Sequence, residues 1–247
     1  RRVLFRSGPS TGLPTKPEQA DLNQALWGRN GECPLVVMAA STPSNCFHYA
    51  FWAGKIAMEH MTPVLLLSDG FIANGSEPWR IPSMKEYPKI TPPIVTRAPE
   101  GGFQPYARDE KRLARMWALP GTKGVEHRVG GLEKDSLSGA VSHDPENHER
   151  MVGLRAAKVA RVQDFIPKQE VVGGRRGELL VVGWGGTYGH LLTAVRELQH
   201  RGEQVSLCHF NFIHPLPRGV REIFSRFRRI VVCELNSGQF AGYLRQD

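Results

Sequence analysis

The residues best suited by type to bind a ligand lie near the start of the chain, in the segment GPSTGLPTK at positions 8–16. This segment brings glycines, a lysine and the hydroxyls of Ser10, Thr11 and Thr15 together directly before a predicted helix. Hydroxyls, backbone N–H groups and a helix N-terminus suit a carboxylate or a phosphate. An ordinary capped loop explains the same residues, and the pattern by itself favours neither interpretation.

A second glycine-rich segment, GWGGTYG at 183–189, lies between a predicted strand and a predicted helix. Glycines at such a junction let the phosphates of a dinucleotide approach a helix N-terminus. The spacing here is G-x-G-G-x-x-G, and no clear acidic residue stands at a strand end about 20 residues later, where a ribose-binding carboxylate is expected. The pattern therefore favours a tight strand-to-helix turn over a dinucleotide site.

The side chains that could serve in acid–base chemistry share a position in a predicted turn or loop: Asp69, Glu126, His127 and Glu133. A single titratable loop residue is usually solvated, so none of them gains a catalytic role unaided. His127 is the best candidate because Glu126 and Arg128 flank it. His143 and His148 flank a predicted helix start and are expected at the surface, and no metal site is predicted.

The four cysteines form no CxxC pair: Cys33, Cys46, Cys208 and Cys233. Most of them neighbour apolar residues in predicted strands or helices, which favours buried, reduced thiols in a cytoplasmic protein. Iron–sulfur clusters draw on closely spaced thiolates, so this chain is not expected to carry such a cluster alone.

The elements that must position these residues alternate between strands and helices in the first third of the chain. Pro17 and Glu18 are expected to open a helix directly after the GPSTGLPTK segment. The apolar runs 34–40 and 63–69 predict two buried strands, with a helix over 46–61 between them. Strand, helix and strand within about 35 residues form a βαβ unit and therefore a parallel sheet.

The middle of the chain differs in composition, because eight of the 18 prolines lie between residues 78 and 120. A long, mostly irregular connection is predicted there, with one helix over 109–117. Asp144 and Pro145 then open a helix that Pro167 ends. The last third predicts a second α/β unit, with strands over 178–185, 204–210 and 229–235 and helices over 187–201 and 218–227.

Composition excludes several classes of protein. The 247 residues are 40% hydrophobic and 23% charged, which rules out bulk disorder. No apolar run approaches the roughly 20 residues that span a bilayer, so no membrane partner is expected. Lysine and arginine number 32 against 24 acidic residues, but they form no long runs, and nucleic-acid binding has little support.

Both ends of the sequence look cut. Residues 1–7, RRVLFRS, show no periodicity and match one translation frame of a common sequencing adapter, so we set them aside as an artefact. Without their three arginines the basic surplus falls to 29 against 24. The chain lacks an initiator Met and stops at what looks like the start of a helix, so we interpret it as an internal fragment of a longer protein.

Six ordered segments of the chain carry a resemblance to a known family: GPSTGLPTKPEQADLNQALWGRNGE, LLLSDGFIANGSEPWRIP, LPGTKGVEHRVGGLEKD, DPENHERMVGLRAAKVA, LLVVGWGGTYG and CELNSGQFAGYLR. Together they resemble the α subunit of 2-oxoacid:ferredoxin oxidoreductases of the 2-oxoglutarate type, from Gly8 to Asp247. The resemblance implies an α/β fold in three parts. The C-terminal part of a thiamine-diphosphate-binding (pyrimidine) domain covers 8–98, a connecting segment with one long helix covers 99–177, and a truncated domain like the transketolase C-terminal domain covers 178–247.

The resemblance also implies an activity. Members of this family decarboxylate a 2-oxoacid oxidatively, give an acyl-CoA and reduce ferredoxin. Thiamine diphosphate with Mg²⁺ would be shared with a β subunit, which would carry the diphosphate site, the metal and the iron–sulfur cluster, and coenzyme A would be the co-substrate. The family's catalytic glutamate lies upstream of this fragment, so no catalytic residue is expected here and the fragment alone should be inactive.

Individual residues follow from the matched motifs. The family's GPSTGLPT loop faces the 2-oxoacid, which implies that Ser10, Thr11 and Thr15 are substrate-side hydrogen-bond donors. Arg6 falls where the family has an arginine, although it belongs to the segment that we set aside. His127 and Arg128 would lie near the entrance for substrate or coenzyme A.

Two other functions are compatible with the same residues. The chain could be a non-catalytic subunit that only docks onto a catalytic chain, or part of a cluster-free thiamine enzyme like transketolase or a dehydrogenase E1 component. Co-purification with a β subunit tests the first alternative, and reduction of ferredoxin or viologen tests the second.

Overall fold

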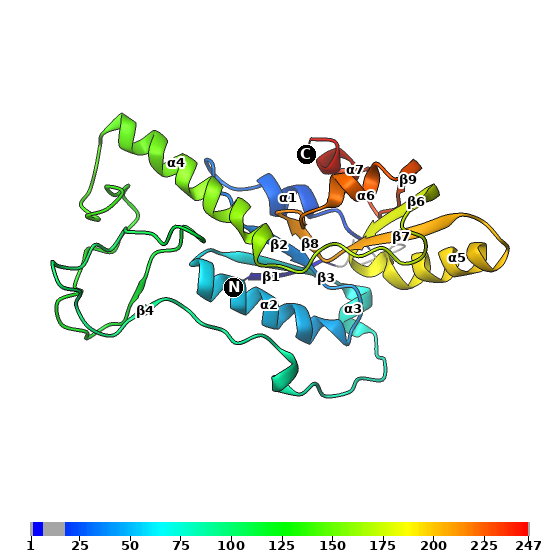
Figure 1. The fold of residues 1–247 in the computed structure, drawn as a ribbon, viewed down its shortest axis with the longest axis horizontal. Helices are drawn as coiled ribbons and strands as arrows, with labels where there is room; N and C mark the ends of the chain where they lie inside the picture. The colour runs from blue at the N-terminus through cyan, green and yellow to red at the C-terminus, as the bar shows by residue number, and fades with distance from the viewer. Residues whose placement is uncertain (1, 7–17, 247) are drawn as a thin grey trace.

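Two larger β-sheets, one mixed and one parallel, organise the described residues, and a long connection between them extends to one end of the molecule (Figure 1). The computed structural model describes residues 2–6 and 18–246. Within them, no helix combines the length and the apolar character that crossing a bilayer requires.

The first sheet has the strand order β1-β3-β2-β8. Its strands are β1 (Arg2–Arg6), β2 (Val36–Ala39), β3 (Val64–Asp69) and β8 (Phe212–His214). Strands β2 and β3 pair in parallel, and helix α2 (Asn45–His60) connects them and packs on the sheet. Every residue of β2 is buried, as its continuous apolar run predicts. The predicted βαβ unit is confirmed.

Strand β1 differs from the expectation that residues 1–7 have no structural role. Arg2–Arg6 pairs in parallel with β3, from Arg2 opposite Leu65 to Arg6 opposite Asp69. Strand pairing uses backbone N–H and C=O groups, which every residue except proline supplies. The backbone of this segment can therefore pair with the edge of β3 regardless of which side chains it carries.

The second sheet has the order β7-β6-β9, and all its pairs are parallel. Its strands are β6 (Gly177–Trp184), β7 (Val205–Phe210) and β9 (Phe227–Val232). The turn η3 (Gly185–Thr187) and helix α5 (Tyr188–His200) link β6 to β7, and α6 (Val220–Phe224) precedes β9. The second predicted α/β unit is confirmed, and α7 (Gln239–Leu244) follows it where a helix start was expected.

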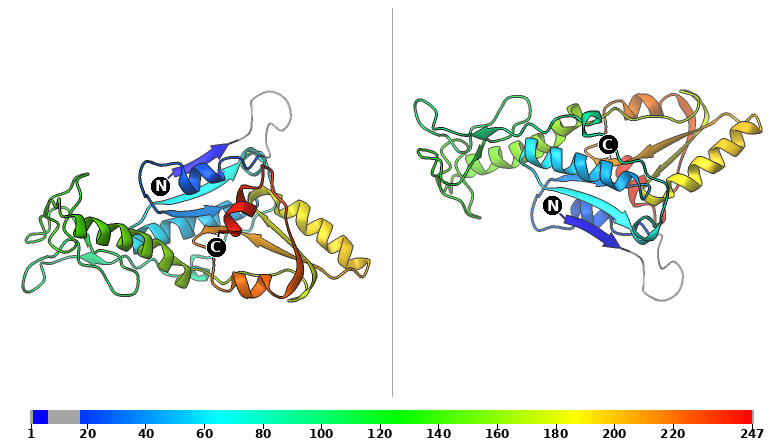
Figure 2. Two further views of the ribbon diagram at one scale, coloured as in Figure 1. Left: turned by 90° about the horizontal axis from the view of Figure 1, so that it is seen from above. Right: turned by 90° about the horizontal axis from the view of Figure 1, so that it is seen from below.

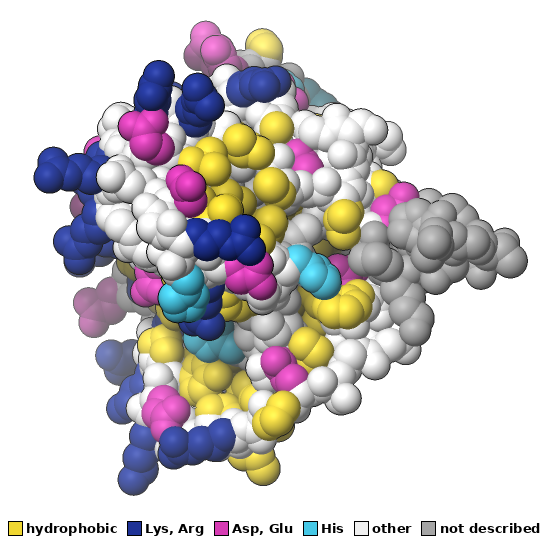
Figure 3. All heavy atoms as spheres, turned by 90° about the vertical axis from the view of Figure 1, so that its right-hand side faces the viewer, with side chains coloured by type: hydrophobic (Ala, Val, Ile, Leu, Met, Phe, Trp, Pro, Cys, Tyr) yellow, Lys and Arg dark blue, Asp and Glu magenta, His cyan; other side chains and the backbone are white. Residues whose placement is uncertain are grey.

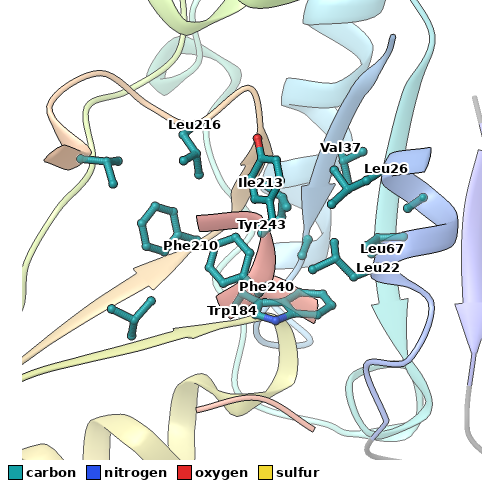
Figure 4. Close-up of a cluster of buried hydrophobic side chains, with 14 of the residues drawn as sticks. Leu22, Leu26, Val37, Leu67, Trp184, Phe210, Ile213, Leu216, Phe240 and Tyr243 are labelled. Atoms are coloured by element: carbon teal, nitrogen blue, oxygen red, sulfur yellow. The ribbon is translucent and has the colours of Figure 1, made fainter. Parts of the chain in front are cut away.

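One hydrophobic core joins the two units. Strand β8 follows β7 directly but pairs antiparallel with β2, so the last third of the chain adds a strand to the first sheet. Figure 4 shows the resulting cluster, in which Trp184, Phe210 and Phe240 face Leu22 and Leu67. Burial of each large apolar side chain contributes about 1.5–3 kcal/mol, so this cluster stabilises the union of the two sheets.

The connection consists mainly of irregular chain, as predicted. It holds α3 (Gly70–Asn74), η1 (Met84–Glu86), the two-residue strands β4 (Ile94–Val95) and β5 (Trp117–Ala118), and then α4 (Pro145–Ala160) and η2 (Arg161–Asp164). Side chains fix it to α2: the indole of Trp117 donates to the carbonyl of Met58 at 2.8 Å, and the N–H of Thr91 donates to Glu59 at 2.8 Å. Figure 2 shows its loops projecting beyond α4.

Two helix predictions were wrong in detail. Helix α1 (Leu22–Trp27) begins several residues after Pro17 and Glu18, because the backbone of Gln19 pairs with Leu235 instead of with a helical turn. No helix forms over 109–117. There the carboxylate of Asp109 accepts N–H bonds from three later residues and folds a turn, which competes with helical hydrogen bonding.

The predicted burial of the cysteines holds for one residue only. Cys208 is buried on β7, whereas Cys46 and Cys233 are half-buried and Cys33 is exposed. Cys33 stands in the irregular stretch after α1, where no sheet or helix covers it. All four thiols are free.

Candidate functional site

The carboxyl ends of β2, β3 and β6 meet in a cleft between the two α/β units. Ala40 and Gly185 follow β2 and β6, Asp69 is the last residue of β3, and all three line the cleft together with Glu18 and Gln19. Ligands of parallel α/β sheets bind outside the carboxyl ends of the strands, so this edge is the expected site. The described residues on either side of positions 7–17 also lie here, because Arg6 is in register with Asp69 and Glu18 lines the cleft.

Gln19 holds the two units together at the floor of the cleft. Its side chain is buried, donates to the carbonyl of Trp184 at 2.7 Å and accepts the N–H of Leu235 at 2.9 Å. The side-chain amide of Asn236 donates to the Gln19 carbonyl at 3.0 Å. Gln19 therefore fixes the chain that leaves positions 7–17 against the ends of β6 and β9.

Asp69 is the buried carboxyl group of the cleft. It ends β3 and caps α3, because its Oδ1 accepts the N–H of Ile72 at 2.8 Å. Burial raises the pKa of this carboxyl, and the backbone hydrogen bonds from Ile72 and Phe71 oppose the rise. A carboxyl group with a raised pKa beside a cleft is suited to exchange a proton with a bound ligand.

Gly186 allows the second unit to approach Asp69. A Cβ at residue 186 would lie 2.3 Å from Oδ2 of Asp69, closer than atoms pack. The glycine-rich segment at 183–189 is therefore a close-packed strand-to-helix turn, as its spacing predicts. The glycines indicated a tight turn here, but nothing in their spacing identified Asp69 as the neighbour.

A hydrogen-bonded turn at the start of α2 forms one wall of the groove that adjoins the cleft. The side chain of Asn45 accepts the N–H groups of Ser41 and Thr42 at 3.0 and 3.1 Å and donates to the Ser41 hydroxyl at 2.6 Å. Glu77 accepts the N–H of Ser44 at 2.6 Å. These bonds fix the hydroxyl-bearing turn, which no pattern in the sequence marked as part of a site.

The cleft continues into an open groove of about 630 Å³ between α3 and the first turns of α5. Phe71 and His190 stand across it with their rings 5.9 Å apart. Among the described residues that line the cleft and the groove there is no lysine or arginine, whereas five are acidic: Glu18, Asp21, Asp69, Glu77 and Glu197. Figure 3 views this end of the molecule and shows Lys and Arg gathered mainly toward one side of the face.

Of the predicted site residues, the structure describes only Arg6, His127 and Arg128. Ser10, Thr11 and Thr15 lie outside the described residues, and Arg6 ends β1 beside Asp69. His127 and Arg128 are exposed in the connection, and Nδ1 of His127 lies 2.9 Å from the carbonyl of Val125. Figure 1 shows the connection that carries them extending away from α3 and α5.

The other residues considered for acid–base chemistry or metal binding are paired with neighbouring groups or exposed to solvent. Glu133 pairs with Arg155 and His148, and Glu126 accepts the N–H of Gly124 at 2.8 Å. His143 is exposed, as expected. Over residues 2–6 and 18–246, no group of three or more His, Cys, Asp or Glu residues is arranged to hold a metal ion.

The fold and the cleft define an α/β protein whose two units meet at the carboxyl ends of their strands. The family described as "Pyruvate flavodoxin/ferredoxin oxidoreductase, thiamine diP-bdg" matches residues 2–143. More than half of the chain lies in this match, and the chain belongs to that thiamine diphosphate-binding family.

Relatives with curated names agree with this assignment. The chain is 49% identical over 241 residues to "2-oxoglutarate oxidoreductase subunit KorA" of Mycobacterium tuberculosis, covering 97% of this chain and 36% of that protein. It is 28% identical to "2-oxoglutarate synthase subunit KorA" of Methanothermobacter marburgensis, covering 95% of this chain and 61% of the relative. The chain thus spans between about a third and three fifths of these relatives.

A solved structure has the same fold. It is the "2-oxoglutarate:ferredoxin oxidoreductase from Magnetococcus marinus with 2-oxoglutarate, coenzyme A and succinyl-CoA bound", and it matches with a TM-score of 0.87 and 30% identity. The match covers 99% of this chain and 43% of that one. The expected α/β class and the family resemblance are confirmed.

Proposed function

We propose that this chain is part of the α subunit of a thiamine diphosphate-dependent 2-oxoacid:ferredoxin oxidoreductase that converts 2-oxoglutarate and coenzyme A to succinyl-CoA. The observation that carries the proposal is the match of residues 2–143 to a thiamine diphosphate-binding family of ferredoxin oxidoreductases. The substrate follows from the relatives, which are named for 2-oxoglutarate, and from the ligands of the Magnetococcus marinus structure.

The described residues of the cleft fit one part of thiamine diphosphate. Ala39, Ala40 and Ile72 supply apolar walls, while Gln19 and Asp69 supply hydrogen-bonding groups, a combination that suits an uncharged heteroaromatic ring. Thiamine diphosphate supplies, when bound, the nucleophilic carbon and the electron sink that decarboxylation of a 2-oxoacid requires. Asp69, which is buried and lines this part of the cleft, is the group of this chain that we expect to hydrogen-bond the ring.

The same residues do not fit the diphosphate. A diphosphate calls for cationic side chains or a metal ion, and the described lining of the cleft and groove contains neither lysine nor arginine. Acidic residues would repel it there. This charge pattern supports a shared cofactor site in which a β subunit binds the diphosphate and Mg²⁺ and carries the iron–sulfur cluster that reduces ferredoxin.

Within that assembly we assign the substrate side to the segment at 8–16. Ser10, Thr11 and Thr15 would donate hydrogen bonds to the 2-oxoacid, and Arg6 stands at the strand end that leads into the segment. His127 and Arg128 stay proposed as residues near the entrance for coenzyme A. We place the assembly in the cytoplasm, where free thiols stay reduced. We also keep the domain division at 8–98, 99–177 and 178–247 as a proposal.

The decisive experiment uses the full-length α subunit co-expressed with its β subunit. We expect 2-oxoglutarate to drive reduction of ferredoxin or methyl viologen only when coenzyme A and thiamine diphosphate are both present. Succinyl-CoA formation without any reduction of ferredoxin would instead identify a cluster-free thiamine enzyme. Full activity of the β subunit alone would identify this chain as a docking subunit.

Thr15→Val tests the substrate assignment within that complex. Loss of a hydrogen bond to the second carboxylate of 2-oxoglutarate costs about 1.5–3 kcal/mol, which lowers kcat/KM about 10- to 150-fold. Pyruvate lacks that carboxylate, so its kcat/KM should change little. An equal loss for both substrates would contradict a contact with the distal carboxylate, and Ser10→Ala serves as the comparison within the same segment.

A further inference from the structure

A second cavity, of about 440 Å³, lies between α4 and two stretches of the connection, away from the cleft. We call it the basic pocket, because its lining includes five cationic side chains and a single acidic one: Arg108, Arg115, Lys134, Arg155, Lys158 and Glu133. Figure 1 shows α4 and the connection on the side of the molecule away from α3 and α5.

The charges converge from separate parts of the chain. Arg155 and Lys158 lie three residues apart on α4, so they share a face of that helix. Arg108 and Arg115 form a backbone bridge with each other, and Lys134 comes from the stretch that follows His127. The tertiary fold, rather than a run of basic residues in the sequence, concentrates positive charge at this cavity.

The single carboxylate in the lining of the pocket already has two partners. Glu133 pairs with Arg155 through an N···O distance of 2.9 Å, and its second oxygen contacts His148. These two partners hold the pKa of Glu133 below its usual range. Glu133 therefore has little capacity left to neutralise the other cations of the pocket.

The other four cations have neutral partners. Arg108 donates to the carbonyls of Tyr106 and Ser136 at 2.9 and 3.0 Å, and Lys158 donates to the carbonyl of Met61 at 2.8 Å. Lys134 donates to the carbonyl of Gly130 at 3.3 Å and also to that of Leu132. Arg115 lies over the ring of Tyr106 at 4.2 Å and reaches the Pro105 carbonyl at 3.5 Å. Within the described residues, no carboxylate forms an ion pair with any of these four.

Burying these positive charges close together costs free energy unless a bound anion compensates them. Lys134 is only 2% exposed, and its two carbonyl partners replace only part of the hydration that a buried ammonium group without a counter-charge loses. Burial lowers the pKa of Lys158 to about 8, and repulsion by Arg115, Arg108 and Arg155 adds to the shift. A bound anion would remove the repulsion and supply acceptors for the unused N–H groups.

We propose that the basic pocket binds a phosphate group of a small-molecule ligand. Several converging charges match a multiply charged oxyanion, and arginine forks suit phosphate oxygens. The volume lies in the range of small-ligand pockets. A Cβ placed at Gly130 or at Gly131 would meet no atom within 4 Å, so the backbone beside the pocket is open to approach.

The test measures binding of pyrophosphate to the full-length protein by calorimetry, in buffer free of phosphate and at low ionic strength. Arg115→Gln is the informative variant, because Arg115 makes the weakest protein contacts of the four cations and its loss should leave the fold intact. Losing one charge-assisted hydrogen bond should weaken binding about 10- to 150-fold. Arg115→Lys should retain part of the affinity, and Arg175→Gln, at an exposed arginine outside the pocket, should change it less than about twofold.

Competition identifies the source of the phosphate. Displacement of pyrophosphate by coenzyme A but not by dephospho-coenzyme A would assign the pocket to the 3′-phosphate of that molecule. Displacement by inorganic phosphate alone would assign it to a free anion, and both results support the site. Absence of pyrophosphate binding, or equal loss in Arg115→Gln and Arg175→Gln, would overturn the proposal. Because no turnover is measured, these outcomes are independent of the proposed oxidoreductase activity.

Discussion

Replacement of Gly186 by alanine should separate the two α/β units where they meet at the cleft. The added Cβ would lie 2.3 Å from Oδ2, 3.2 Å from Cγ and 3.5 Å from Oδ1 of Asp69. To relieve the contact with Oδ2, either η3 must move away from β3 or the carboxylate must rotate. Rotation breaks the 2.8 Å hydrogen bond from Ile72 that caps α3.

The expected cost follows from these two responses. Insertion of a methyl group into a packed contact costs about 1–3 kcal/mol, and loss of a side-chain cap costs about 0.5–2 kcal/mol. Alanine also lowers the conformational entropy of the unfolded chain, which offsets about 0.4–1 kcal/mol of this destabilisation. We therefore expect Gly186→Ala to lower the free energy of unfolding by about 2 kcal/mol.

The assay is urea denaturation followed by tryptophan fluorescence, since Trp184 is buried beside the altered residue. Gly189→Ala is the matched control. Gly189 begins the next turn on α5, and a Cβ there would meet no atom within 4 Å. Because alanine favours helix over glycine, Gly189→Ala should leave stability unchanged or raise it by up to about 1 kcal/mol.

A double-mutant cycle identifies the contact. In an Asp69→Ala background the obstructing carboxylate is gone, so Gly186→Ala should cost less than about 0.5 kcal/mol. The same 2 kcal/mol loss in both backgrounds, within about 0.5 kcal/mol, would refute the contact between Gly186 and Asp69.

Three further predictions concern other buried polar groups. Burial lowers the pKa of His209 to about 4 from its ordinary 6.5, so the unfolded chain binds more protons between these pH values and stability falls as pH falls from 6.5 to 4, by about 1.4 kcal/mol per pH unit. Burial lowers the pKa of His60 to about 4 as well, so in a denaturation series His209→Gln should reduce the slope by about 1.4 kcal/mol per pH unit without abolishing it, whereas the exposed His143→Gln should leave it unchanged. Gln19→Ala removes two side-chain hydrogen bonds and should destabilise the protein by about 1–3 kcal/mol, although the Trp184 carbonyl keeps its bond from the Thr187 hydroxyl. Gln24→Ala, at an exposed position of α1, should change stability by less than about 0.5 kcal/mol. Glu59→Gln weakens the attachment of the connection to α2, so limited proteolysis should cut the connection faster; an unchanged rate would contradict that role of Glu59.

Local pattern predicted the elements that carry the cleft. The apolar runs 34–40 and 63–69 became β2 and β3, and the helix between them became α2. Asp144 and Pro145 predicted the start of α4, where the Asp144 side chain accepts the N–H of Glu146. These features depend on neighbouring residues, whose propensities and caps act over one turn or one strand. The resemblance of ordered motifs to a family supplied the function, and the family match agrees with it.

Predictions from local sequence pattern were wrong where a hydrogen-bonding partner outside the local pattern determined the structure. The start of α1 was misplaced because Gln19 bonds to residues 165 and 216 positions later in the chain. The turn at Asp109 replaced a predicted helix because a side chain captured the backbone N–H groups that a helix would use. The basic pocket had no signature either, since its cations are scattered singly from Arg108 to Lys158.

The sequence by itself determined two βαβ-type units, an irregular connection and membership of a family, because each depends on short-range periodicity or on ordered motifs. Only the tertiary structure decided that β8 crosses into the first sheet, that Asp69 meets Gly186 at the cleft and that five cations share one cavity. The first two contacts arise because a shared hydrophobic core brings together segments more than a hundred residues apart, whereas the cations meet across about 50 residues of irregular chain and one helix. Packing over either separation leaves no period in the chain.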